Sequence, residues 1–61
     1  MDVKAAREAL NEAHQISWET RRMLYRAAGE DKSLWPATLA VTTRLDLFDK
    51  KVTKAKRALE N

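Results

Sequence analysis

The helical pattern of this sequence is broken at one stretch, Gly29-Glu30-Asp31-Lys32-Ser33-Leu34-Trp35-Pro36, which holds the only glycine and the only proline of the 61 residues. The segments on either side are rich in Ala, Leu, Glu, Lys and Arg, which favour helices. The pattern predicts an all-α fold in a single domain over residues 1–61. We expect one helix over about 3–28, a loop over 29–35 and a second helix over about 36–60.

Capping residues set the expected helix ends. Asp2 is suited to cap the first helix, because its carboxylate can accept from free amides of the first turn. Gly29 suits the left-handed position just past a helix end. Ser33 is the expected cap of the second helix, and Pro36 is tolerated only in a first turn, where its missing N–H has no partner in any case.

Apolar or small residues recur at alternating spacings of three and four in both predicted helices, as in heptad repeats. The first set is Val3, Ala6, Leu10, Ala13, Ser17, Thr20, Leu24 and Ala27. The second is Leu34, Ala37 or Thr38, Val41, Leu45, Phe48, Val52, Ala55 and Leu59. A short loop between the helices predicts an antiparallel helical hairpin.

Chain length argues for self-association. A core from about 60 residues rarely supplies more than about 3–5 kcal/mol, so small folds need disulfides, metals or oligomers. With no cysteine and one histidine, oligomerisation is the remaining option. We therefore expect a homodimeric four-helix bundle. Its predicted interface consists of Leu10, Ile16, Leu24, Val41, Leu45, Phe48, Val52 and Leu59.

Another side of the first helix carries aromatic and basic residues and no acidic ones. Trp18 and Tyr25 are seven residues apart and lie off the apolar set. Three explanations stay open: packing in an oligomer, anchoring of a protein partner, and stacking with phosphate contacts to nucleic acid. The predicted partner-binding residues are Asn11, His14, Trp18, Arg21, Arg22 and Tyr25.

The second helix has a further, shorter apolar set opposite the main one, and this set makes the loop-proximal half the favoured extra interface. Its members are Pro36, Leu39, Ala40, Thr43 and Leu47. A basic run follows it and accounts for much of the net charge of +3. The run is either a solvated helix face or an anion-binding patch. Its basic residues are Lys50, Lys51, Lys54, Lys56 and Arg57.

Several classes of chemistry are disfavoured. Without cysteine and with one histidine, we expect no metal and no cofactor, and one glycine excludes a glycine-rich phosphate loop. His14 and Ser17 lack an orienting third group, and the carboxylates Asp46 and Asp49 are expected to face solvent, so we expect no enzyme and no small-molecule substrate. The apolar runs are too short to span a membrane, and a cytoplasmic location is expected.

The outline of about 60 residues in one cysteine-free helical hairpin resembles that of the Rop-type plasmid regulators, in length and layout alone. That resemblance implies a four-helix bundle dimer that binds paired RNA through one helix face. The leading hypothesis is a non-enzymatic interaction protein that self-associates and binds a macromolecular partner, with a protein favoured, as a regulator or adaptor. The alternative is a nucleic-acid-binding hairpin dimer, and a third option is a structural assembly subunit.

Overall fold

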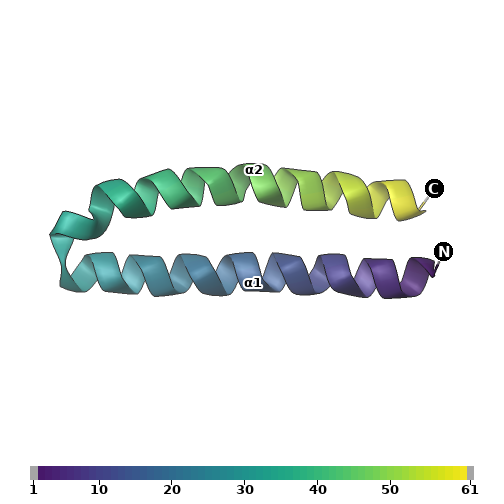
Figure 1. The fold of residues 1–61 in the computed structure, drawn as a ribbon, viewed down its shortest axis with the longest axis horizontal. Coiled ribbons are helices and arrows are strands. Elements are labelled where there is room, and N and C mark those ends of the chain that lie inside the picture. The colour runs from purple at the N-terminus through teal and green to yellow at the C-terminus, as the bar shows by residue number, and fades with distance from the viewer. Residues whose placement is uncertain (1, 61) are drawn as a thin grey trace.

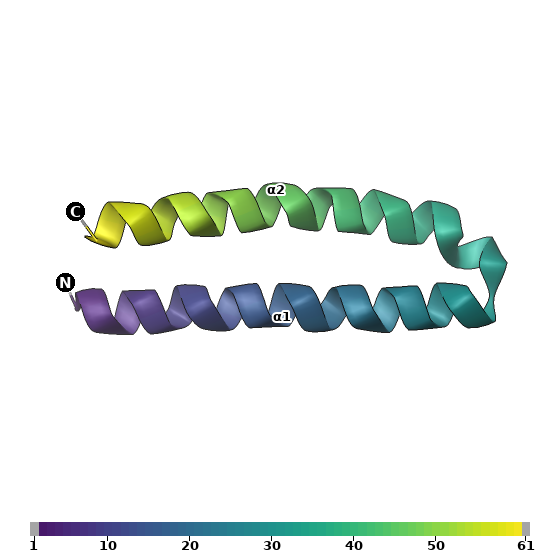
Figure 2. The same ribbon diagram turned by 180° about the vertical axis from the view of Figure 1, so that it is seen from behind.

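The chain folds into two long helices joined by a tight connection. A computed structural model describes residues 2–60, with α1 at Val3–Glu30, a short 3-10 helix η1 at Lys32–Leu34 and α2 at Trp35–Glu60. α1 and α2 lie side by side and run in opposite directions, so the start of α1 and the end of α2 lie at the same end of a rod measuring 45 × 15 × 12 Å (Figure 1). The view from behind shows the same arrangement (Figure 2). The predicted all-α class with two helices is confirmed.

The start of α1 follows the predicted capping. The Asp2 carboxylate accepts from the backbone N–H of Ala5 at 3.1 Å, which satisfies one of the free amides of the first turn. Pro36 lies in the first turn of α2, as predicted, where no intrahelical partner is lost.

The connection between the helices differs from the prediction. Gly29 lies inside α1 with a negative φ, so the expected left-handed residue after the helix is wrong. The helix continues to Glu30, and the Asp31 carboxylate accepts from both the backbone N–H and the hydroxyl of Ser33, at 3.0 and 2.7 Å. Asp31 rather than Ser33 therefore organises the turn, and these hydrogen bonds lower its pKa, the Ser33 hydroxyl contributing most.

Small and polar residues form the seam between the two helices. We define the seam by the buried residues of the described chain, which are Ser17, Arg21, Ala28, Thr38, Thr42 and Val52. Only Ala28 and Val52 among them are apolar, at 0% and 5% exposure. The contact within one chain therefore fully buries few large apolar side chains, while Leu10, Leu24, Leu45 and Leu59 are half-buried.

α2 is rotated relative to the predicted orientation. Thr38 and Thr42 are buried in the seam, whereas Val41 and Phe48 of the predicted set are each 41% exposed. The Thr42 hydroxyl is satisfied within α2, where it donates to the carbonyl of Leu39 at 3.2 Å. The rotation leaves large apolar side chains on one face of the pair.

Candidate functional site

The most highly structured group of side chains is a cluster around Arg21, which we call the polar cluster and define as His14, Trp18, Arg21, Asp46 and Asp49. The Arg21 guanidinium contacts Asp49 at 2.7 Å and Asp46 at 2.9 Å, and donates to the carbonyl of Thr42 at 3.4 Å. The hydrogen bond to Asp49 is the main cause of a raised Arg21 pKa, so this buried side chain is charged. A buried cation is tolerated here because two carboxylates surround it.

Two expectations about this cluster are corrected. Arg21 was predicted to point outward as a partner-binding residue, but its side chain is 9% exposed and lies in the seam. Asp49 was expected to face solvent, but its side chain is only 17% exposed because it accepts from Arg21, whereas Asp46 is 66% exposed. The heptad spacing of Asp49 between Leu45 and Val52 is the sequence signal that places it in the seam.

Trp18 covers the outer side of Arg21. Its ring centre lies 5.1 Å from the guanidinium carbon, a cation–π distance, and its indole N–H donates to His14 Nε2 at 3.0 Å. Nε2 of His14 therefore carries no proton in this arrangement, and Nδ1 faces Asp49 at 3.7 Å. Trp18 itself is 49% exposed, so it is both anchored to the cluster and open to a partner.

The remaining predicted partner-binding residues, Asn11, Arg22 and Tyr25, are all exposed on α1. Tyr25 packs against Trp35 of α2 with ring centres 5.9 Å apart, and it is 44% exposed. Asn11 and Arg22 are exposed on the flank of α1. Two separate aromatic pairs, His14 with Trp18 and Tyr25 with Trp35, therefore lie along the same side of the helix pair.

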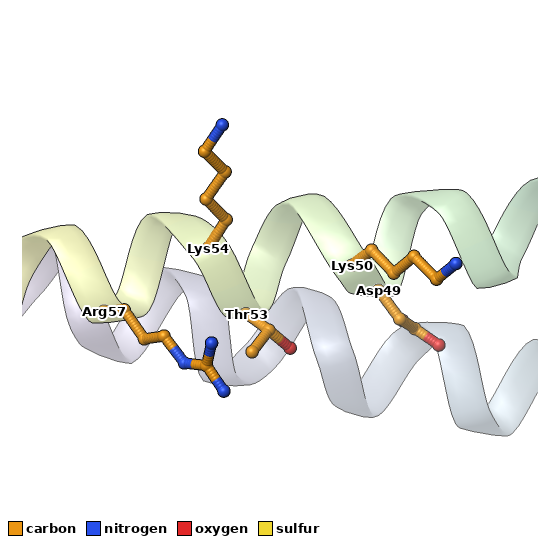
Figure 3. A pocket seen from close by; sticks show the side chains of 5 residues that line it. All are labelled: Asp49, Lys50, Thr53, Lys54 and Arg57. Carbon is orange, nitrogen blue, oxygen red and sulfur yellow. The ribbon is translucent and has the colours of Figure 1, made fainter.

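The basic run is spread around α2 instead of forming a single patch. Lys50, Lys54 and Arg57 line an open hollow together with Asp49 and Thr53 (Figure 3). Asp49 and Thr53 point toward α1, while Lys54 extends away from it (Figure 3).

The other two basic residues of the run lie outside this hollow. Lys51 is exposed and lies two residues past the seam-facing Asp49, hence on the far side of α2 from the seam. Lys56 is half-buried. Three basic residues and one carboxylate therefore share the hollow, and its positive charge is smaller than the sequence run predicts.

Large apolar side chains gather on the side opposite the polar cluster. We call this side the apolar face and define it by Ile16, Met23, Val41 and Phe48, which are 54%, 70%, 41% and 41% exposed. His14 and Ile16 are two positions apart, or about 200° around a helix, and so are Asp46 and Phe48. A shallow apolar hollow connects the two helices on this face. It is lined by Ala13, Ile16, Ser17, Thr20, Leu45 and Phe48.

The predicted oligomer residues divide into three groups by exposure. Ile16, Val41 and Phe48 are exposed on the apolar face, and Val52 is buried in the seam of its own chain. The others are half-buried, namely Leu10, Leu24, Leu45 and Leu59. Val52 therefore packs within its own chain, whereas the exposed members are available to contact a second molecule.

Ser17 and His14, the pair considered for nucleophilic chemistry, do not contact each other through a hydrogen bond in the structure. Ser17 is 2% exposed and its hydroxyl has no hydrogen-bond partner within residues 2–60, while His14 bonds to Trp18, so the two do not form a nucleophile–base pair. Among these residues no group of three His, Asp or Glu side chains could hold a metal ion. Neither described helix is long and apolar enough to cross a membrane.

Comparison with known proteins gives no relative: no family model matches this chain, and neither a curated protein nor a solved structure shows significant similarity to it.

Proposed function

We propose that this chain is a small, non-enzymatic interaction protein that acts as a regulator or adaptor. Its helical hairpin pairs with a second copy through the apolar face, giving a four-helix bundle. The opposite side, with Trp18 and Tyr25, then points outward and binds a protein partner.

The exposed apolar face is the observation that carries this proposal. The chain exposes 4984 Å², whereas a compact 7.0 kDa monomer exposes about 4,000 Å² by the usual scaling. The excess of roughly 900–1,000 Å² is close to the roughly 800 Å² that each partner buries in a standard interface. A second copy is the favoured occupant because an identical apolar face is self-complementary under twofold symmetry.

The outward side has the composition of a recognition surface. Trp, Tyr and Arg are over-represented among residues that dominate binding energy, because they bury large areas at low entropic cost. Trp18 is held in place by Arg21 and His14, so little side-chain freedom is lost when a partner covers it. This preorganisation favours Trp18 as the central anchor.

Self-association is tested with a matched pair of substitutions, Phe48→Asp and Leu47→Asp. The two residues are adjacent and 41% and 50% exposed, but Leu47 lies off the apolar face. Sedimentation equilibrium should show a dimer for the wild type and for Leu47→Asp. For Phe48→Asp it should show a monomer with reduced helicity by circular dichroism. A folded, monomeric wild type at high micromolar concentration would contradict the proposal.

Partner binding is tested at Trp18. Trp18→Ala should leave the dimer mass unchanged and abolish co-purification of the protein partner, whereas Trp18→Phe should retain part of the binding. Loss of the dimer in Trp18→Ala would instead place the aromatic ring in an oligomer contact.

The second candidate function is nucleic-acid binding, favoured by the hollow between Lys50, Lys54 and Arg57 (Figure 3). Phosphate contacts from such cations release counterions, so affinity should fall steeply with added salt. A labelled panel of RNA and DNA hairpins, titrated at 50 and 200 mM salt, tests this candidate. The absence of binding at the lower salt concentration would eliminate it.

A further inference from the structure

We propose that the two copies pair with their loops at the same end of the bundle, so that α1 of each chain lies against α2 of the other. This proposal rests on the self-association proposed above and specifies its geometry. It is carried by four charged residues at the outer edges of the apolar face: Glu12 and Glu19 on α1, and Arg44 and Lys51 on α2.

The acidic pair borders the apolar face on α1. Glu19 follows Ile16 by three residues and precedes Met23 by four, so it lies beside both along the helix. It is also two positions from Ser17 and from Arg21, which face the seam, and therefore points away from α2. Glu12 lies one heptad before Glu19, and both residues are exposed.

The basic pair borders the same face on α2 in the same relation. Arg44 follows Val41 by three residues and precedes Phe48 by four, and Lys51 lies one heptad further along. Arg44 is two positions from the buried Thr42 and therefore points away from α1. Both basic residues are exposed. The outer edge of the apolar face on α1 thus carries Glu12 and Glu19, with the exposed Arg26 one heptad further toward the loop, and the outer edge on α2 carries the two basic residues.

The charged residues also lie level with one another along the rod. Arg21 contacts the carbonyl of Thr42, and His14, seven residues before Arg21, contacts Asp49, seven residues after Thr42. Glu19 and Arg44 lie two residues beyond the first contact.

Glu12 and Lys51 lie two residues beyond the second contact. The acidic and basic edges are therefore in register by height along the rod.

Twofold symmetry allows two ways to pack the apolar faces with the helices aligned. With the loops at the same end, equivalent residues of the two copies lie at the same position along the rod, and α1 faces the partner's α2. Glu19 then meets Arg44 of the other copy and Glu12 meets Lys51, and symmetry produces each pair twice.

With the loops at opposite ends, α1 faces α1 and α2 faces α2. The two basic edges of α2 then meet, which is unfavourable, and neither Glu19 nor Glu12 faces Arg44 or Lys51 of the other copy. The charge pattern therefore selects the arrangement with both loops at one end.

The basic residues in the half of α2 away from the loop do not change the preferred orientation of the two copies. Lys50, Lys54 and Arg57 line the hollow on the polar side of α2, which faces away from the partner (Figure 3). The bundle separates these two groups, and salt screens charges over about 8 Å at physiological ionic strength. The edge charges, which meet directly, determine the orientation.

Spin labelling measures the orientation directly. Because the chain has no cysteine, a Lys32→Cys substitution gives one label per loop. Loops at one end should place the two labels within about 25 Å, since packed helices lie about 10 Å apart. Loops at opposite ends should separate them by about the 45 Å length of the rod.

A label at Gln15→Cys, near mid-length, is the control and should report a similar distance in either arrangement. A long Lys32 distance in a confirmed dimer would overturn the orientation while leaving self-association intact. A monomer, with no dipolar signal at either site, would overturn both.

Charge reversal tests the edge residues themselves. Arg44→Glu with Lys51→Glu should weaken the dimer by on the order of tenfold to a hundredfold at low salt, because four attractive pairs become repulsive. Adding Glu12→Lys and Glu19→Lys to the same chain should restore wild-type affinity. With loops at opposite ends, the double variant would dimerise as tightly as the wild type, since like charges already meet there.

Lys50→Glu with Lys54→Glu makes the same change in net charge away from the apolar face and should leave the dimer affinity within about threefold of wild type. If both double variants weaken the dimer equally, net charge and not edge pairing is responsible, and the proposal fails.

Discussion

Arg21 shows how one charged side chain can be structural in a position that a helical wheel assigns to the surface. Its guanidinium lies in the seam between Asp46, Asp49 and the carbonyl of Thr42, with Trp18 over its outer side. A cation so placed would be costly without its carboxylates, and the pairing fixes the height of α1 relative to α2. Arg21 therefore lies beneath Trp18 in the proposed recognition surface and contributes no exposed charge to it.

The two carboxylates around Arg21 should differ in their importance for stability. Asp49→Asn should lower the free energy of unfolding by about 1–3 kcal/mol, because a nearly buried charge loses its closest partner. Asp46→Asn should cost less than about 1 kcal/mol, since that carboxylate is 66% exposed and water screens it. Urea denaturation of both variants measures the difference. Equal losses would mean that Arg21 does not depend mainly on Asp49.

Asp31 gives the turn a defined dependence on pH. Hydrogen bonds from Ser33 lower its pKa in the folded chain below the ordinary value of 3.8. A lowered folded pKa contributes stability that is fully present above the unfolded pKa and lost as the pH falls through the folded pKa.

The reference for this effect is Asp31→Asn, which retains a capping oxygen but does not titrate. The wild type should be the more stable of the two at neutral pH and should lose that advantage below pH 3.8. Thermal unfolding of both proteins between acidic and neutral pH measures it. A difference that does not change with pH would contradict the assigned role of Asp31.

At the scale of the helices, the sequence predicted the extent of each element better than its rotation. The cap at Asp2, the place of Pro36 and the position of the break follow from local chemistry, and all three hold in the structure. The rotation of α2 about its axis does not follow from local chemistry, because two sets of residues that could face α1 lie side by side on α2. The set with Val41 and Phe48 is more apolar, yet Thr38 and Thr42 pack closer to α1.

The polar cluster could be predicted only in part for a related reason. The sequence places Trp18 and His14 in the same predicted partner-binding set. The role of Asp49 depends instead on the relative height of two helices, which spacing within one helix does not define. Val41 and Phe48 belong to the predicted apolar set of the second helix and to the predicted oligomer interface, because burial usually favours large apolar residues. In the structure they lie on the apolar face and not in the seam. The strongest hydrophobic pattern in α2 therefore indicates the apolar face.

Gly29 allows the end of α1 to be tested. It lies inside the helix, φ is not positive, and an added Cβ would meet nothing within 4 Å. Gly29→Ala should therefore stabilise the fold by about 0.5–1 kcal/mol, because alanine loses less backbone entropy in a helix. Thermal unfolding should show a higher Tm. A destabilised variant would show that Gly29 needs the left-handed conformation that the sequence suggested.

At the scale of the whole molecule, stability and association should be inseparable. The seam buries only Ala28 and Val52 as apolar side chains, and a core of this size cannot offset the conformational entropy of about 60 ordered residues. If the missing apolar burial comes from a second copy, the folded state contains two chains and the unfolded state contains one. Mass action then couples folding to protein concentration.

The resulting prediction is a Tm that depends on concentration. Each tenfold dilution should lower the free energy of unfolding of the dimer to two unfolded chains by about 1.4 kcal/mol per mole of dimer, since one association equilibrium is involved. Circular dichroism melts from 5 to 500 µM should therefore shift steadily upward in Tm, and Phe48→Asp should abolish the shift together with much of the helicity. Leu47→Asp, which leaves the apolar face intact, should keep the wild-type slope. A Tm that is constant over this range, with full helicity at the lowest concentration, would mean that a single chain is stable with its apolar face exposed to water.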